Sequence, residues 1–298
     1  MANERVALLF QTHFLDRATA RFLRRLIRQA GPRIEVFVIA NLRADEAPPS
    51  CLADFPHHVT RSEAIRIPDY PAKSFGPDWN LWHGGHSDLI ALDFFRSYPD
   101  YGRYWVMEYD VRFSGDWGHF FSALEEVEAD FLATTVRRRE DHPEWCFWET
   151  LRGPEPLGRG EAIACFMPIH RASNAAMRVM DAAYRQGWTG HLEATWPTLV
   201  ARAGLSVLDL GGSGPFTPAA LRGRFYSNTP RALYLAPGSF VFKPVMHRTG
   251  TAPDRLWHPV KPYRLRDEFR QGLRDVRTDL GRLHQRLRPA MISRQESS

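Results

Sequence analysis

The sequence predicts an α/β fold: a mixed, mostly parallel β-sheet flanked by helices, followed by a C-terminal amphipathic helix. Short runs of β-branched and aromatic residues alternate with stretches of helical periodicity. The first forty residues are typical of strand, helix and strand, which favours a parallel pair with a right-handed crossover. The 298 residues, 44% of them hydrophobic and 24% charged, suffice for a sizeable core. A disordered chain, a collagen and a multi-pass membrane protein are excluded.

The first unit begins with the apolar run 6–10, which predicts a buried strand. Asp16 is placed to cap the helix that follows, and Gly31-Pro32 to end it. Residues 34–40 are rich in β-branched side chains and predict the second strand.

The same alternation continues after a stretch, 41–80, that its prolines mark as loop-rich. We expect helices at 87–97, 120–128, 174–184 and 192–203, and strands at 104–107, 130–136, 161–167 and 206–210. Residues 211–262 are rich in Gly and Pro and have short strands at most. We therefore expect an α/β domain over 1–255 and a helical extension over 256–298.

The formal net charge of +5 is concentrated near the C-terminus. Residues 264–288 hold eight arginines and four acids, so the rest of the chain is close to neutral and a nucleic-acid partner is not expected. Apolar residues recur there every three or four positions, at Leu265, Phe269, Leu273, Val276, Leu280, Leu283 and Leu287. This helix could pack on its own domain, form a homodimer, or lie on an anionic membrane surface.

The cysteines and the N-terminus predict where the protein resides. Three cysteines without metal-like spacing fit a reducing cytoplasm with free thiols. The start lacks the apolar region of a signal peptide, and no apolar run approaches the ~20 residues that span a bilayer. We expect a cytoplasmic protein, with attachment to the inner face of the membrane as a further possibility.

The triplet Glu108-Tyr109-Asp110 follows an apolar strand and is the most informative motif. Residues i and i+2 of a strand point to the same side, and ligands of α/β proteins bind at the carboxyl ends of parallel strands. Two carboxylates that face one crevice can hold a hard divalent cation. The alternative is a pair of solvated acids in a turn.

The run 104–115 is similar to a less-studied glycosyltransferase group in which W-x-x-E-x-D-V-R-x-x-G recurs, and it resembles nucleotide-sugar glycosyltransferases of the GT-A fold. The resemblance spans about residues 5–260 and is specific around 104–117. It implies metal-dependent transfer of a sugar from a nucleotide-sugar donor to a saccharide or lipid-linked acceptor, in bacterial surface polysaccharide synthesis. It also implies Mn²⁺ or Mg²⁺ at Glu108 and Asp110, although the common motif has Asp where this chain has Glu108.

The resemblance implies further residues of the active site. A histidine from the C-terminal region would complete the metal site, and His247 is favoured over His258 because a strand is expected to end there. Glu193, at a helix start, is the expected general base on the acceptor hydroxyl, which would give inversion. Its alternative role is electrostatic support of the helix N-terminus. Asp110 is expected to act in catalysis as well as in metal binding.

The nucleotide-sugar is expected to bind at the end of the first strand and along the aromatic stretch 78–88. The residues expected to contact it are Gln11, Thr12, His13, Lys73, Trp82, Asp88 and Tyr109. The stretch from Arg137 to Trp148 could contact the acceptor saccharide or its phosphate through Arg and Trp. A solvated loop with two buried tryptophans is the alternative.

Two other functions compete with glycosyl transfer. Residues 207–214 (VLDLGGSG) resemble the glycine-rich motif of methyltransferases that use S-adenosylmethionine. Only 84 residues follow Gly214, and Pro215 and Pro218 disfavour a long helix after the glycines. The other alternative is a non-catalytic protein that binds a nucleotide or saccharide on the same fold.

Overall fold

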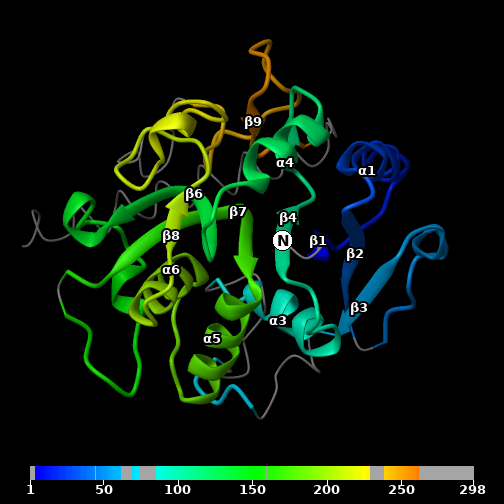
Figure 1. The fold of residues 1–298 in the computed structure, drawn as a ribbon. Coiled ribbons are helices and arrows are strands. Elements are labelled where there is room, and N and C mark those ends of the chain that lie inside the picture. The colour runs from blue at the N-terminus through cyan, green and yellow to red at the C-terminus, as the bar shows by residue number, and fades with distance from the viewer. Residues whose placement is uncertain are drawn as a thin grey trace, which may run out of the picture. The chain divides into compact units, whose positions relative to one another are not determined.

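The computed structural model describes residues 4–43, 45–61, 69–73, 85–158, 160–228 and 238–261 (Figure 1). The chain divides into two units, residues 1–260 and 261–298, and the first holds the sheet and the helices that flank it. The helix expected at 264–288 and the expected nucleotide contact Trp82 lie outside the described residues.

A seven-stranded sheet forms the centre of this unit, with the strand order β3-β2-β1-β4-β7-β6-β8. Its strands are β1 Val6–Thr12, β2 Ile34–Leu42, β3 His57–Arg61, β4 Arg103–Glu108, β6 Phe131–Arg138, β7 Ile163–Ser173 and β8 Val207–Asp209. Neighbouring strands are parallel except that β7 runs antiparallel to both β4 and β6. The mixed, mostly parallel sheet expected from the sequence is confirmed.

The reversed strand β7 sets which segments meet at one edge of the sheet. Its pairing aligns Met107 of β4 with Ile169 and Arg137 of β6 with Ala164. The start of β7, from Ile163 to Met167, therefore lies beside the carboxyl ends of β4 and β6. Those ends are the edge at which α/β proteins bind ligands.

Helices cover both faces of the sheet (Figure 1). They are α1 Arg17–Ala30, α3 Asp88–Ser97, α4 Trp117–Glu125, α5 Asn174–Arg185 and α6 Leu192–Arg202, with short 3-10 helices at Ser50–Asp54, Arg139–Asp141, Trp148–Thr150 and Ala219–Leu221. Alternate residues of β1 face opposite layers: Leu9 packs in the core under α3, α5 and α6, and Leu8 packs under α1 and α4. The unit thus has three layers with a core on each side of the sheet.

The ends of the first helix follow the sequence signals. The Asp16 carboxylate accepts the Thr19 N–H at 2.8 Å, and Gly31 ends the helix with a φ of +76°. Ser173 caps α5 in the same way through the N–H of Ala176. The elements expected within the described residues are therefore present, with boundaries that differ by a few residues.

Three strands were not foreseen. β3 lies in the stretch expected to be loop-rich, because its edge position against β2 needs little apolar surface. β5 (Arg112–Phe113) pairs with β9 (Leu256–Trp257), and two-residue strands carry no readable period. Among the described helices none is long and apolar enough to span a bilayer.

Candidate functional site

The acidic pair lies where β4 ends. Glu108 is the last residue of the strand, and its carbonyl accepts the Val111 N–H at 3.1 Å, which turns the chain back on itself. Asp110 is therefore in a turn, whereas the sequence analysis assumed that both acids lie on one strand. The two carboxylates converge because of this turn rather than because of strand periodicity.

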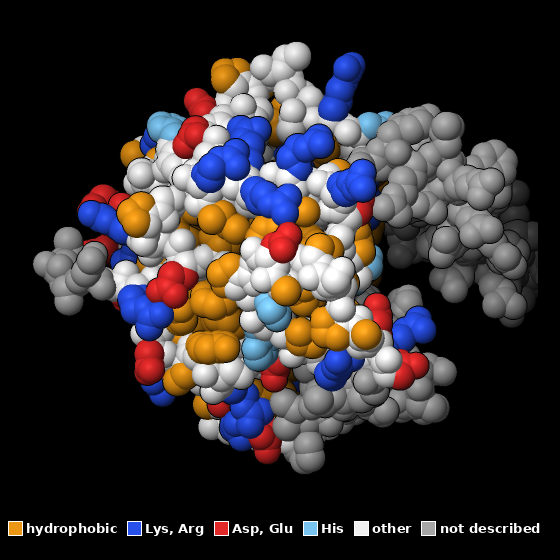
Figure 2. Space-filling model, turned by 90° about the vertical axis from the view of Figure 1, so that its right-hand side faces the viewer, with side chains coloured by type: hydrophobic (Ala, Val, Ile, Leu, Met, Phe, Trp, Pro, Cys, Tyr) orange, Lys and Arg blue, Asp and Glu red, His pale blue; other side chains and the backbone are white. Residues whose placement is uncertain are grey.

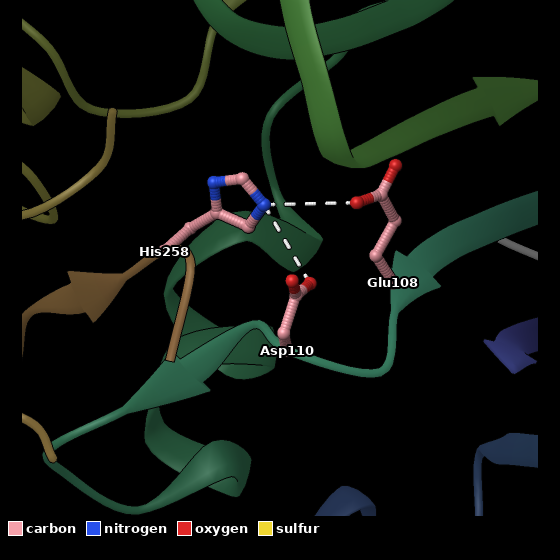
Figure 3. A group of neighbouring side chains, drawn as sticks. All are labelled: Glu108, Asp110 and His258. Atoms are coloured by element: carbon pink, nitrogen blue, oxygen red, sulfur yellow. Dashed lines mark ion pairs between the residues drawn. The ribbon is translucent and has the colours of Figure 1, made fainter. Parts of the chain in front are cut away.

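His258 completes the group, and a small two-stranded sheet brings it there (Figure 3). β9 pairs with β5, and the Val260 N–H donates to the Asp110 carbonyl at 2.8 Å. The His258 Nε2 lies 3.6 Å from Glu108 Oε2 and 3.5 Å from Asp110 Oδ1. One potential ligand atom from each of the three residues lies within 4.8 Å of the others. We call Glu108, Asp110 and His258 the acidic trio.

A backbone carbonyl and two aromatic rings fix the orientation of the His258 imidazole. Its Nδ1 lies 2.8 Å from the Val241 carbonyl, which can only accept, so Nδ1 carries a proton and the neutral ring has its lone pair on Nε2. The rings of Phe166 and Phe240 pack against it at 5.2 and 5.3 Å. Burial opposes the charged ring, but the trio's carboxylates outweigh it and raise the pKa of His258. The histidine is thus held in a fixed orientation and faces two acids.

The donor set fits a divalent cation of the kind that the resemblance implies. Carboxylate oxygens suit Mg²⁺ and Mn²⁺, and an imidazole nitrogen favours Mn²⁺ because Mg²⁺ prefers oxygen. Side-chain exposure is 37% for Glu108, against 5% for Asp110 and 6% for His258. The trio is therefore enclosed on one side and open near Glu108, where a further ligand could reach.

His247, expected as the third ligand, is exposed and is not a member of the trio. The reason is the pairing of neighbouring segments: Met246 bridges to Val260, two residues beyond His258. His258, the alternative in the sequence analysis, is the histidine that the β5–β9 pair holds beside Asp110.

Glu193 is the other acid near the trio. It sits in the first turn of α6, and its Oε1 accepts the Met167 N–H at 3.2 Å. Burial raises the pKa of Glu193 to about 7; the Met167 hydrogen bond and Arg137 act against the rise, and the Glu108 carboxylate adds to it. A carboxyl group with this pKa is half-ionised near neutral pH, which suits a general base.

The end of β1 borders the acidic turn. Gln11 pairs directly with Glu108 across the sheet, and both Gln11 and Thr12 are buried. His13 is exposed, and its ring lies 5.3 Å from the ring of Tyr109. Four of the seven residues expected to contact a nucleotide-sugar therefore lie together beside the trio. Their contact with a nucleotide stays a prediction.

Lys73 and Asp88 occupy the core instead of an open cleft. Both side chains are fully buried, and Lys73 Nζ lies 3.3 Å from Asp88 Oδ2. The same oxygen accepts hydrogen bonds from Trp196 Nε1, at 2.9 Å, and from the Tyr184 hydroxyl. This network ties α3 to α5 and α6, so its visible role is in packing, and nucleotide binding by Lys73 and Asp88 stays a prediction.

A basic groove of about 890 Å³ runs along α1 (Figure 2). Its arginines are Arg17, Arg21, Arg24, Arg25, Arg28 and Arg112. The helix itself contains no acid; its N-cap Asp16 also lines the groove and Arg24 pairs with Asp54, so arginines outnumber acids on this face. Arg112 also donates to the carbonyl of Tyr109 at 2.6 Å, which links the groove to the acidic turn. The sequence analysis assigned the basic character to 264–288 alone and missed this groove.

Asp209, in the run that resembles a methyltransferase motif, accepts hydrogen bonds from neighbouring segments of the chain. Its Oδ1 accepts the N–H groups of Gly211 and Gly212 at 2.9 and 2.7 Å. Its Oδ2 accepts the Val136 N–H at 3.1 Å and the Tyr226 hydroxyl at 2.6 Å. The carboxylate organises the loop and the end of β6 without a ligand.

We expect Asp209→Ala to lower the free energy of unfolding by about 3 kcal/mol, because four buried donors lose their acceptor. Urea denaturation followed by circular dichroism measures this. The control Asp54→Ala removes only an exposed ion pair with Arg24 and should cost less than about 1 kcal/mol. Equal stability of the two variants would contradict the structural role of Asp209.

The comparisons with known proteins add little. No protein-family model matches the chain, and no curated protein matches it. Among solved structures, it is similar to one described as a glucose-1-phosphate thymidylyltransferase from Bacillus anthracis in complex with sucrose. The two are 10% identical, the match covers 73% of this chain and 92% of that chain, and the TM-score is 0.39. A likeness this low carries no argument about activity.

Proposed function

We propose that the protein is a metal-dependent glycosyltransferase that moves a sugar from a nucleotide-sugar to a hydroxyl group of a saccharide or glycolipid. The observation that carries the proposal is the acidic trio at the ligand-binding edge of the sheet, with Glu193 close enough for its pKa to respond to Glu108 and His258. Cation ligands and a poised base within one site are what this reaction needs.

Each part of the site has a role in the proposed reaction. Glu108, Asp110 and His258 would hold Mn²⁺ or Mg²⁺, which when bound neutralises the charge that develops on the departing nucleoside diphosphate. The rings of His13 and Tyr109, beside Gln11 and Thr12, would seat the base. The arginines of the α1 groove would attract the anionic donor to this side.

Glu193 would take the proton from the acceptor hydroxyl as that oxygen attacks the anomeric carbon. The Met167 N–H holds Oε1, and Oε2, which lies 3.8 Å from His191 Nδ1, would take the proton from the acceptor. Attack that displaces the diphosphate directly inverts the configuration at the anomeric carbon. If the acceptor is linked to a lipid, the proposal includes binding of residues 264–298 to an anionic membrane or to a second copy of the chain.

The test is a thermal-shift series with UDP, GDP, ADP and dTDP, each with and without Mn²⁺. We expect one diphosphate to raise the Tm only when Mn²⁺ is present, since a ligand at 100 times its Kd stabilises the native state by about 2.7 kcal/mol. Slow Mn²⁺-dependent hydrolysis of the matching nucleotide-sugar should follow. Binding without any hydrolysis would favour the non-catalytic alternative, and a shift with S-adenosylmethionine alone would favour the methyltransferase.

A further inference from the structure

The Arg137 side chain carries a buried N–H group that makes no hydrogen bond. It lies near the carboxyl end of β6, and its Nε is buried with no hydrogen-bond partner. Within the described part of the chain its side chain makes no ion pair, and its guanidinium lies over the ring of Trp145 at 5.3 Å. A buried polar group without a partner costs about 1–3 kcal/mol, more if it is charged, so a ligand that supplied the partner would recover part of that cost.

The backbone that presents Arg137 is fixed. The register of β6 shifts between Thr134 and Arg137, and Thr135 has a φ of +51°, which is rare for a β-branched residue. Asp209 and Tyr226 hold the irregular segment by accepting the N–H groups of Val136, at 3.1 Å, and of Thr135, at 2.6 Å. The guanidinium is thus directed by a pinned bulge rather than by a flexible loop.

The surroundings of Arg137 are mainly aromatic, and Glu193 is the carboxyl group near enough to act on its pKa. Trp145 packs with Ala194 of α6, one residue from Glu193, and the ring of Phe147 stacks on His191 at 4.0 Å. Burial lowers the pKa of His191 to about 3, so that ring is neutral. A guanidinium stacked on an aromatic face keeps its N–H edges free for a carboxylate or phosphate.

Glu193 relates Arg137 to the acidic trio. Its pKa is influenced by Arg137 as well as by Glu108 and His258. Along β7, Ala164 pairs with Arg137, Met167 donates its N–H to Glu193, and Ile169 pairs with Met107, the residue before Glu108. Glu193 is therefore placed between Arg137 and the acidic trio along this strand, which puts Arg137 on the acceptor side of Glu193 in the proposed reaction.

We infer that Arg137 and Trp145 form an acceptor subsite that binds a sugar with an anionic substituent, a carboxylate or a phosphate, close to the reacting hydroxyl. This inference rests on the proposed function, because Glu193 marks the acceptor side. The guanidinium binds the anion through its N–H groups, and the bound anion accepts the hydrogen bond that Nε lacks in the folded chain.

The test uses the full chain without nucleotide or Mn²⁺, and titration calorimetry with glucuronate, glucose 6-phosphate and glucose. One of the two anions should bind, and glucose should bind at least tenfold more weakly. Arg137→Gln should lower the affinity for the anion by tenfold or more, and Arg137→Lys should lower it by less. Arg138→Gln, on the exposed neighbour, should leave the affinity unchanged. Which anion binds distinguishes an acidic sugar from a sugar phosphate.

Equal anion affinity in Arg137→Gln and the wild type, or no binding of either anion to the wild type, would overturn the inference. Neither outcome touches the nucleotide series, which tests the proposed function separately. Arg137→Gln should unfold at a Tm no lower than the wild type, because it removes an unpaired buried charge. A large fall in Tm would assign Arg137 to packing and would also overturn the inference.

Discussion

Asp110→Asn is expected to abolish the Mn²⁺-dependent thermal shift with nucleoside diphosphate and to lower donor hydrolysis by about 100-fold or more. The amide has nearly the same size but no charge, and its nitrogen cannot bind a cation. Asp110 is the more enclosed of the two acids, at 5% side-chain exposure, so water cannot easily replace it. Calorimetric titration of Mn²⁺ into the variant gives the loss of metal affinity directly.

Asp54→Asn is the matched control for Asp110→Asn. It makes the same chemical change at an exposed residue in the 3-10 helix before β3, where Asp54 pairs with Arg24. Mn²⁺ affinity and donor hydrolysis should stay within twofold of the wild type. If Asp110→Asn retains Mn²⁺-dependent nucleotide binding at wild-type affinity, the acidic trio is not the metal site, and the proposed function loses its main support.

Local sequence signals were enough to place most of the secondary structure. Short apolar runs predict strands such as β1 and β4, and Asp16 and Gly31 mark the ends of α1. The importance of Glu108 and Asp110 followed from one property, their place directly after a buried strand. These inferences needed only residues that are close together along the chain.

The third member of the trio depends on a contact between distant segments. His258 reaches Asp110 because β9, the two-residue strand before it, pairs with β5, which lies about 145 residues earlier in the chain. No period in the sequence reports such a pairing, and the expected strand end favoured His247 over His258. The turn at 108–111, which replaces the assumed strand geometry, also closes through one hydrogen bond that composition does not reveal.

Charged residues were harder to interpret than apolar ones. Lys73 and Asp88 have the composition of a surface site, yet each provides the buried partner that the other needs. The arginines of α1 recur at helical spacing. In the net charge of the main body, however, acids far from α1 cancel them, so the sum does not reveal the cluster. Burial and clustering of charge are decided by packing, which the linear sequence specifies only through the whole fold.

Glu193→Gln should separate chemistry from binding. The amide cannot accept a proton from the acceptor hydroxyl, so transfer should fall by about 10²- to 10⁴-fold. Its oxygen can still accept the Met167 N–H, and the acidic trio is untouched, so Mn²⁺-dependent nucleotide binding should remain within about threefold of the wild type. Loss of both transfer and nucleotide binding would point to a structural role for Glu193 instead.

The pH dependence of the wild type gives an independent check on Glu193. Since its pKa is raised to about 7 and the base must be ionised, transfer should increase as pH rises through 7 and then level off. The native state binds this proton more tightly than the unfolded chain does, so the free energy of unfolding should fall by up to about 3 kcal/mol between pH 4.5 and 7. Glu193→Gln lacks that proton equilibrium, so its unfolding free energy, from urea titrations at pH 5 and pH 8, should exceed that of the wild type only at pH 8. The same difference at both values would mean that Glu193 does not titrate in this range, and the assignment of the general base would fail with it.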